Sequence, residues 1–254
     1  MKTVIVIAAV PQEIKLLETS LEHSGRVTAG GFEYVKGTLG GVHVVVCAGG
    51  VGKINAAAAT AVMIARYQPQ LVINTGCAGA YLGSGLSVGA LVVALEEILA
   101  DEGVVVSSGW KDLEYMHIPS VQQGTLSCYN VVPLSRHAAE KAMQLADYYG
   151  VSLVRGRSAT VSTCSGTQAY GAEISGRWNA LIENMEGAAV AQVCLRCGVD
   201  CLEIRGISNA VEDRDLKKWN IPKAVEAAQR FVLKYIEEMN RPDASPASKT
   251  TRAT

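Results

Sequence analysis

The strongest constraint on this chain is the alternation of short, wholly apolar runs with longer segments of helical periodicity. The first apolar run covers residues 2–9, and the segment after Pro11 repeats Ile14, Leu17 and Leu21 at helical spacing. A wholly apolar run is typical of a strand that is covered on both faces. The start of the chain therefore predicts a buried strand that leads directly into a helix.

The same alternation continues along the chain and predicts an α/β protein. Gly40-Gly41 joins two apolar runs and is typical of a two-residue hairpin. The order of elements predicts a three-layer α/β/α fold with a central mixed sheet, in which functional groups belong at the carboxyl ends of strands. The further predicted strands cover 32–39, 42–47, 71–75, 91–98, 104–106, 158–163 and 201–208, and the further helices follow a glycine-rich turn at 49–52 or cover 135–149, 186–197 and 222–239.

Charge and composition exclude several classes of function. The chain has 254 residues with 23 Lys and Arg against 24 Asp and Glu, and this near-neutral balance argues against nucleic acid as the main partner. No apolar run reaches the roughly 20 residues that a membrane-spanning helix needs. The length fits one α/β domain, predicted at 1–240, and the polar tail at 241–254 is expected to be mobile and functionally silent.

Cysteine usage indicates a reducing compartment. The 7 cysteines are an odd number spread along the chain, which favours a cytoplasmic protein over a disulfide framework. The short apolar amino terminus is followed at once by Pro11, so a buried strand is favoured over a signal peptide. Cys194, Cys197 and Cys201 include a C-x2-C step, but no second ligand pair accompanies it. We interpret these three as structural core thiols.

Four polar segments follow predicted strands or begin predicted helices, where free backbone N–H groups can meet a ligand. The glycine loop 49–52 matches neither a dinucleotide-binding loop nor a Walker loop and is a weak signal by itself. The segments are AAVPQE (8–13), AGGVGKINAA (48–57), NTGCAGA (74–80), and NMEGAAVAQV (184–193) together with IRGISNAVEDRD (204–215).

Taken together and in this order, the segments resemble the nucleoside phosphorylase and nucleosidase superfamily, and more closely its hydrolase branch. That branch includes the methylthioadenosine/S-adenosylhomocysteine nucleosidases, and residues 207–221 look most like the futalosine hydrolases of menaquinone biosynthesis. The resemblance implies cleavage of a purine N-ribosidic bond by water, with a small nucleoside as substrate and with no metal or cofactor. It also implies a homo-oligomer.

The chemistry of such a cleavage names the side chains to look for. An oxocarbenium-like ribosyl centre requires a carboxylate to activate water, groups that hold the ribose, and hydrogen bonds to the departing base. By resemblance, Glu13 activates water, and its position after Pro11 favours the ionised form. Met185 lines the sugar and Glu186 accepts hydrogen bonds from ribose hydroxyls. Without the other motifs, each glutamate would be interpreted as an ordinary residue at a helix start.

Ser208 and Asn209 match the positions that engage the base, and Asn209 departs from the Asp of adenosine-type nucleosidases. An amide can donate to O6 and accept from N7–H, so Asn209 fits hypoxanthine, but an amide can also flip and serve adenine. It cannot supply the proton for the leaving base, for which water, Asp213 and Asp215 are alternatives. Asn184 is a second departure, because the nucleosidases commonly have Glu there.

Cys77, Ala78 and Gly79 match the lining of the water and base pocket. In the phosphorolytic relatives this region offers arginines and hydroxyls to phosphate, whereas here it has Thr75 and no Arg, so the resemblance favours hydrolysis over phosphorolysis. We interpret Cys77 as a small pocket residue and not as a nucleophile, since no His neighbours it in the sequence.

The benzoate of futalosine would require a cation. Four cationic side chains are candidates for this contact, and the sequence does not rank them. Trp219 and Tyr115 are candidates to pack against the benzoate ring. The charge of Arg205, inside an apolar strand, requires a buried partner. The alternatives to futalosine hydrolysis are a methylthioadenosine/S-adenosylhomocysteine nucleosidase, an inactive nucleoside-binding protein and a phosphorylase. The candidate cations are Arg214, Lys53, His117 and Arg136.

Overall fold

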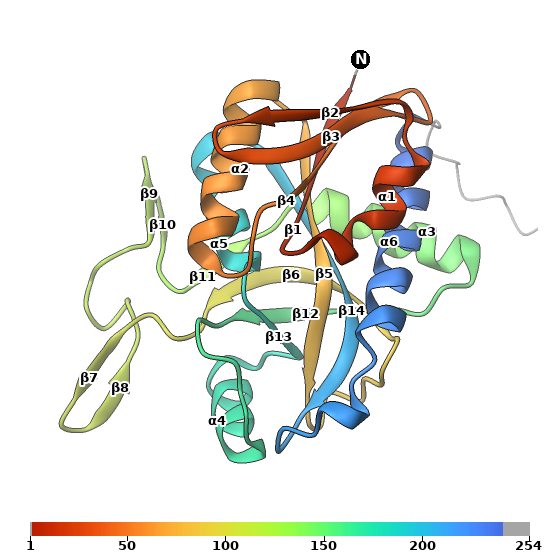
Figure 1. Ribbon diagram of the computed structural model, residues 1–254. Coiled ribbons are helices and arrows are strands. Elements are labelled where there is room, and N and C mark those ends of the chain that lie inside the picture. Colours follow the sequence, from red (N-terminus) through yellow and green to blue (C-terminus); the bar gives the residue numbers. More distant parts are fainter. Residues whose placement is uncertain (1, 241–254) are drawn as a thin grey trace, which may run out of the picture.

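The computed structural model describes residues 2–240 and is organised around one mixed sheet. Its ten strands are β1 (Thr3–Ala8), β2 (Glu22–Ala29), β3 (Phe32–Leu39), β4 (Val42–Ala48), β5 (Leu71–Tyr81), β6 (Leu91–Leu99), β11 (Val131–Pro133), β12 (Leu153–Thr160), β13 (Ile182–Asn184) and β14 (Asp200–Val211). Their order is β11-β6-β12-β13-β5-β1-β4-β3-β2, and β14 pairs with both β5 and β6 (Figure 1). Two small hairpins project from this body: β7 (Val104–Val106) with β8 (Gly109–Lys111), and β9 (Val121–Gln123) with β10 (Leu126–Cys128).

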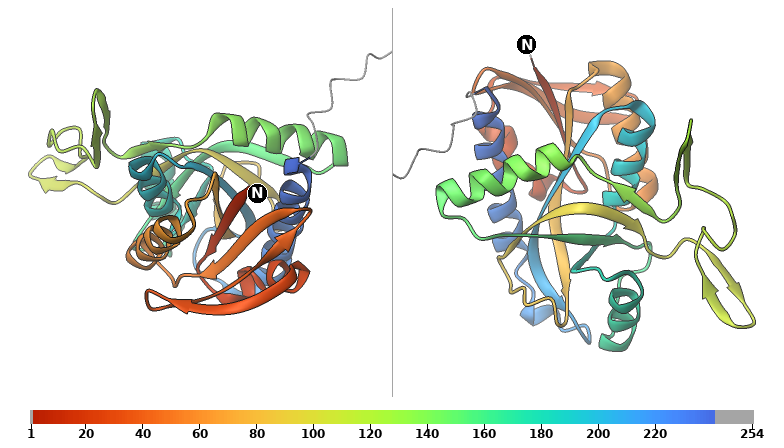
Figure 2. Two further views of the ribbon diagram at one scale, coloured as in Figure 1. Left: turned by 90° about the horizontal axis from the view of Figure 1, so that it is seen from above. Right: turned by 180° about the vertical axis from the view of Figure 1, so that it is seen from behind.

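Helices cover the sheet on both faces, which confirms the predicted three-layer α/β/α fold (Figure 2). One face carries α1 (Lys15–Ser20), α3 (Arg136–Tyr149) and α6 (Ile221–Glu237). The other carries α2 (Lys53–Tyr67) and α5 (Gly187–Cys197), while α4 (Gln168–Trp178) packs near the end of β5. Three 3-10 turns complete the chain: η1 (Pro11–Glu13), η2 (Leu216–Lys218) and η3 (Glu238–Asn240).

The two faces of β1 explain its wholly apolar sequence. Val4 and Val6 belong to the core under α1, α3 and α6, whereas Ile5 and Ile7 belong to the core under α2 and α5. All four side chains are fully buried. Because successive side chains of a strand point to opposite faces, both faces of β1 are covered by a helix layer from Val4 to Ile7, and apolar residues occupy all of these positions.

The central strands extend beyond their predicted ends. The predicted strands 71–75 and 201–208 are parts of β5 and β14, which pair with each other from Asp200–Leu71 to Val211–Tyr81. The segment 74–80 is therefore a strand and not a loop after one. Its polar groups are satisfied inside the sheet: the Thr75 hydroxyl donates to Ile204 O at 2.9 Å. Candidate site residues thus lie on rigid strands.

The other predicted helices and strands have the predicted type of secondary structure but begin or end at different residues. The hairpin pairs Leu39 with Val42 around Gly40-Gly41, as predicted. The helix predicted after Pro11 is only η1 followed by the short α1, and the strand predicted at 158–163 is β12, which starts and ends earlier. The sequence patterns missed α4, the exposed strand β2 and most of the short strands, including β13, because those segments are too short or too exposed to show a clear period.

The cysteine cluster is only partly buried. Cys194 and Cys201 lie in the core, as predicted, but Cys197 is exposed at the end of α5, so the prediction is wrong for Cys197. Among residues 2–240, no group of three His, Cys, Asp or Glu side chains is placed to hold a metal ion. No helix in the same range has both the length and the apolar character needed to cross a membrane. The predicted tail, 241–254, lies outside the described residues.

Gly206 of β14 tests how tightly α6 packs on the sheet. A Cβ atom there would lie 2.0 Å from the backbone oxygen of Ala224 in α6, so no side-chain rotation could relieve the contact. Gly206→Ala should lower the free energy of unfolding by about 1–3 kcal/mol or more. The control is Gly176→Ala on the exposed side of α4, where nothing lies within 4 Å. That change should raise stability by about 0.5–1 kcal/mol. Urea unfolding of the two variants measures both effects, and equal stabilities would contradict the described packing.

Candidate active site

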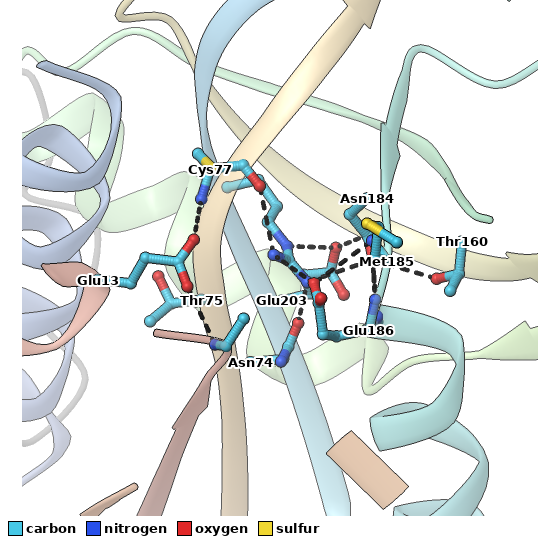
Figure 3. A network of polar contacts seen from close by, with 12 residues as sticks. Glu13, Asn74, Thr75, Cys77, Thr160, Asn184, Met185, Glu186 and Glu203 are labelled. Atoms are coloured by element: carbon cyan, nitrogen blue, oxygen red, sulfur yellow. Dashed lines mark hydrogen bonds and ion pairs between the residues drawn. The ribbon is translucent and has the colours of Figure 1, made fainter. Parts of the chain in front are cut away.

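Two glutamates that are far apart in the sequence meet near the middle of the sheet. Glu13 comes from η1, and Glu186 precedes the first turn of α5. They are joined through β5 and β14, since Cys77 contacts Glu13 and Arg205, and Arg205 contacts Glu186 (Figure 3). The structure therefore brings together the two carboxylates that the sequence singled out.

Backbone N–H groups hold the Glu13 carboxylate. Its Oε2 atom accepts hydrogen bonds from Ala9 N at 3.0 Å and Val10 N at 3.2 Å, and its Oε1 atom accepts one from Cys77 N at 2.9 Å. The side chain is 3% exposed. These three donors are more specific than the helix-dipole effect inferred from the sequence, and they fix the position of the carboxylate.

Arg205 is the buried cation of the site. Its guanidinium contacts the carboxylates of Glu203 at 3.2 Å and Glu186 at 3.5 Å and donates to the carbonyl of Cys77 at 3.3 Å and the side chain of Asn74. Burial alone would lower the pKa of Arg205, but the surrounding carboxylates outweigh this and raise it. The prediction that Arg205 requires a buried acidic partner is therefore confirmed in the geometry.

Gly76 makes the approach of these groups possible. A Cβ atom on Gly76 would lie 2.5 Å from Glu13 Oε1 and 2.9 Å from Arg205 Nη1. Any side chain at this position would displace the carboxylate or the guanidinium. The glycine is thus a steric requirement of the site.

Glu186 is anchored at both oxygens, and Met185 lies beside it. Glu186 Oε1 accepts from Gly52 N at 3.0 Å, which ties the glycine loop to the site, and Oε2 accepts from Met185 N at 3.3 Å. The Met185 sulfur lies 3.2 Å from the Cys164 sulfur. Met185 and Gly52 also line a pocket of about 740 Å3, so this end of the site is open to a small molecule.

Asn184, whose role the sequence left open, is the hydrogen-bonding hub beneath Glu186. Its Oδ1 atom accepts from Glu186 N at 2.8 Å and Gly187 N at 2.7 Å and so caps the start of α5. Its Nδ2 atom donates to Glu97 Oε1 and Ser158 Oγ, both at 2.8 Å. A glutamate at this position could not donate to Glu97, so the amide is matched to its acidic neighbours.

Glu97 and Glu203 form a buried acidic pair that the sequence patterns did not reveal. The position of a Cβ atom on Gly187 would be 2.2 Å from both Glu97 Oε1 and Glu203 Oε2, so the two carboxyl groups lie close together. Burial, followed by the negative charge of Glu203, raises the pKa of Glu97 well above its usual value of 4.5. Ionising two adjacent buried carboxyl groups at once is energetically unfavourable, which favours one proton shared between them.

The base-binding candidates lie along β5 and β14, beyond Cys77. Ser208 Oγ lies 2.7 Å from Asn209 Oδ1 and 3.2 Å from the carbonyl of Ala78. Ser208 is 2% exposed, and its hydroxyl orients the Asn209 amide; its contact with a base stays a prediction. Gly79 is opposite Asn209 in the strand register.

The remaining candidates are not equivalent. Burial and then the charge of Glu13 raise the pKa of Cys77 to about 12, which disfavours a thiolate nucleophile.

Two of the candidate cations have partners. Lys53 is paired with Asp101 at 2.7 Å and with Glu102 at 3.1 Å. Arg214 lies 5.1 Å from the ring centroid of Trp219.

The other two candidate cations are unfavourably placed. Arg136 is exposed at the start of α3 and pairs with Glu140 at 2.8 Å. His117 and Tyr115 lie on the exposed segment after the β7–β8 hairpin. Within the described chain, the structure does not bring any of these side chains to Glu13 or Glu186.

Comparisons with known proteins agree with this geometry. The sequence model of the Phosphorylase superfamily matches residues 3–237. A 5'-methylthioadenosine/S-adenosylhomocysteine nucleosidase of Bacillus thuringiensis is 32% identical over 237 residues, which is 92% of this chain and 98% of that protein. The crystal structure of the nucleosidase of that name from Neisseria meningitidis, in complex with methylthio-immucillin-A, is 28% identical with a TM-score of 0.82, over 94% of this chain and 100% of that one.

A futalosine hydrolase structure has the same fold. The mutant from Helicobacter pylori strain 26695 aligns with a TM-score of 0.82 over 94% of this chain and 100% of its own, at 22% identity. At that identity, the likeness concerns the fold.

Glu97→Gln tests the shared proton. Because the folded-state pKa of Glu97 is raised, the protonated form contributes stability that is complete below pH 4.5 and is lost as the pH rises through the folded-state value. The loss is at most about 1.4 kcal/mol per pH unit. The variant keeps a neutral donor, so its free energy of unfolding should fall less with rising pH than that of the unmodified protein. Glu96→Gln, on the same strand and paired with Arg157, is the control. Parallel pH curves for the Glu97 variant and the unmodified protein would contradict the assignment.

Proposed function

The chain belongs to the phosphorylase superfamily and resembles its nucleosidases, and from this premise we propose that it cleaves purine N-ribosidic bonds with water. In its specific form, we propose that the substrate is futalosine and that the products are hypoxanthine and dehypoxanthine futalosine. The observation that carries the proposal is the convergence of Glu13 and Glu186 through Cys77 and Arg205.

Glu13 has the acceptor capacity that water activation requires. A carboxylate has about four lone-pair sites, and the three backbone donors leave roughly one of them free. That free site is on Oε1, since Oε2 accepts from both Ala9 N and Val10 N. A water molecule at Oε1 can transfer a proton to Glu13 while its oxygen attacks the ribosyl carbon.

Glu186 is suited to the ribose. Beyond the hydrogen bonds from Gly52 N, Met185 N and Arg205 Nη1, about one of its four acceptor sites is left for a sugar hydroxyl. Arg205 stabilises its negative charge. A fixed carboxylate near the sugar also stabilises the positive charge that develops on the ribosyl ring as the bond to the base breaks.

The site favours hydrolysis over phosphorolysis. The hydroxyl of Thr75 donates to Ile204 O inside the sheet and is therefore not available to an anion. Lys53 faces the pocket beside Met185 together with Asp101 and Glu102. An added phosphate there would meet a cation that is already neutralised.

Asn209 supports a 6-oxopurine base. Ser208 donates to the amide oxygen, and the amide nitrogen donates one hydrogen to the Ala210 carbonyl at 2.9 Å, so its second hydrogen is left to donate to O6 of hypoxanthine. The source of the proton for the leaving base stays open between water, Asp213 and Asp215. Asp213 accepts from Gln168 N and Asp215 caps η2, so each already has a structural role.

Arg214 and Trp219 support a benzoate-bearing substrate. Unlike Lys53 and Arg136, Arg214 has no ion pair among the described residues, and its guanidinium lies over the Trp219 ring. Burial, followed by the charge of Glu183, raises the pKa of the Cys164 thiol, and the nearby charge of Arg214 partly opposes this; Cys164 in turn contacts Met185. A guanidinium beside an indole matches the carboxylate and the ring of a benzoate.

A methylthioadenosine/S-adenosylhomocysteine nucleosidase is the second candidate. The relatives at 32% identity bear that name. This similarity supports the second candidate at least as strongly as the features of Asn209 and Arg214 support the first. The two candidates share the carboxylates and differ in the base and in the group on the far side of the sugar.

Glutamine variants test the two carboxylates. Glu13→Gln cannot take a proton from water, and Glu186→Gln loses the charge that faces Arg205. Each change should lower turnover by about two orders of magnitude or more, the size of a lost acid–base group. Glu18→Gln, on the neighbouring α1, is the control, and its turnover should equal that of the unmodified protein. Turnover within a few-fold of normal for Glu13→Gln or Glu186→Gln would refute the role assigned to that residue.

Product identification tests the proposed substrate. The protein is incubated with futalosine, inosine, adenosine and methylthioadenosine, each with and without phosphate, and the released base is identified by chromatography. We expect hypoxanthine from futalosine at a rate that phosphate does not change. Release of adenine alone would assign the protein to the second candidate, dependence on phosphate would indicate a phosphorylase, and recovery of every nucleoside intact would indicate a binding protein.

A further inference from the structure

We propose that Glu183 is a specificity-determining residue that selects a 6-oxopurine by accepting the N1–H of the base. The inference rests on the proposed nucleosidase function and deepens it. Asn209 alone is compatible with either purine, because an amide can offer its donor or its acceptor. A fixed carboxylate beside it removes this ambiguity.

Glu183 and Asn209 lie in one row across the sheet, on the two sides of Gly79. In the strand register, Gly79 of β5 is opposite Glu183 of β13 and also opposite Asn209 of β14. A Cβ atom on Gly79 would lie 3.3 Å from Asn209 Nδ2 and 3.5 Å from Glu183 Cγ. Both side chains are therefore on the same face of the sheet, with a residue that has no side chain between them.

The carboxylate of Glu183 is held rigidly by a loop that also reaches the sugar end of the site. Ser165 N donates to Oε1 at 3.0 Å, and Ser165 Oγ donates to Oε2 at 2.6 Å. The preceding residue, Cys164, contacts Met185. Each oxygen of Glu183 thus has one donor and keeps about one acceptor site for a ligand.

A second buried group faces the same carboxylate. The Tyr81 hydroxyl is buried and has no hydrogen bond of normal geometry among the described residues. Burial and then the charge of Glu183 raise the pKa of Tyr81, so the phenol stays protonated near this carboxylate. Glu183 and Asn209 are each 8% exposed, so neither residue is completely enclosed.

Glu183 and Asn209 complement the hydrogen-bonding pattern on one edge of hypoxanthine and do not complement the same edge of adenine. Hypoxanthine presents O6, an acceptor, next to N1–H, a donor. Asn209 Nδ2 supplies the donor for O6, and Glu183 supplies the acceptor for N1–H. Adenine presents an unprotonated N1, and two acceptors facing each other without a proton leave a buried polar group unpaired.

Ser165 strengthens this selection. Its N–H and hydroxyl are two donors near Glu183 that could otherwise serve the acceptor N1 of adenine, and the carboxylate accepts from both. Glu183 therefore provides the hydrogen bond for one purine and withdraws two donors that the other could use.

Glu183→Gln tests the proposal with substrates of matched shape. The kcat/KM is measured for futalosine and for its analogue with a 6-amino group in place of the 6-oxo group. The unmodified protein should prefer futalosine, and the variant should reduce this preference by about 10- to 100-fold, the size of a lost hydrogen bond to a charged group. Glu173→Gln, which removes an exposed carboxylate from α4, is the control and should keep the preference unchanged.

Binding of the free bases provides a measurement that does not depend on turnover. Titration calorimetry with hypoxanthine and with adenine should show the same loss of discrimination in Glu183→Gln, while thermal unfolding reports whether the variant is folded. If Glu183→Gln does not fold, Ser165→Ala, which removes the hydroxyl donor and so frees an acceptor site of the carboxylate, should change the ratio of the two bases.

The outcomes separate this inference from the proposed function. An unchanged hypoxanthine-to-adenine ratio in a folded Glu183→Gln variant would overturn the inference, whatever the turnover. A changed ratio together with absent turnover in the unmodified protein would support the inference and refute the nucleosidase function. A preference of the unmodified protein for the 6-amino analogue and for adenine would overturn both the inference and the assignment to futalosine.

Discussion

The site depends on one buried guanidinium. Arg205 lies inside β14, 1% exposed, where an unpaired charge would be strongly destabilising. It is stabilised by Glu203 and Glu186, and its contact with the Cys77 carbonyl joins it to the strand that holds Glu13. The cation thus allows several carboxyl groups to be buried together, and removing it would leave them without a counter-charge.

Much of the fold and part of the site could be predicted from the sequence. The wholly apolar run of β1 and the Gly40-Gly41 turn are local signals, and both identify their elements correctly. Glu13 and Glu186 could be selected because they stand in motifs that resemble a known superfamily. Their meeting in space follows from the parallel arrangement of β1 with β5 and of β5 with β14, which the alternation of strands and helices favours.

The remaining residues could not be predicted because their roles depend on strand register. Glu97 and Glu203 are on different strands, and nothing near either residue in the sequence indicates a buried acidic partner. The same applies to the placement of Glu183 beside Asn209: the sequence singled out Asn209 alone, and the two residues flank Gly79 only through the strand register. The extension of β5 and β14 was also missed, because Gly and polar residues normally indicate the end of a strand. Here those residues are the site itself.

The hydrogen bonds that define this site come largely from peptide groups. Ala9, Val10 and Cys77 hold Glu13, and Gly52 holds Glu186, in each case through the main-chain nitrogen. Mutation can exchange the methyl, isopropyl or thiol group at these positions without touching the contact, and only proline removes the donor. Related chains can therefore keep these hydrogen bonds while their side chains at the same positions differ. The conformation of the main chain then shows the relationship more reliably than sequence identity does.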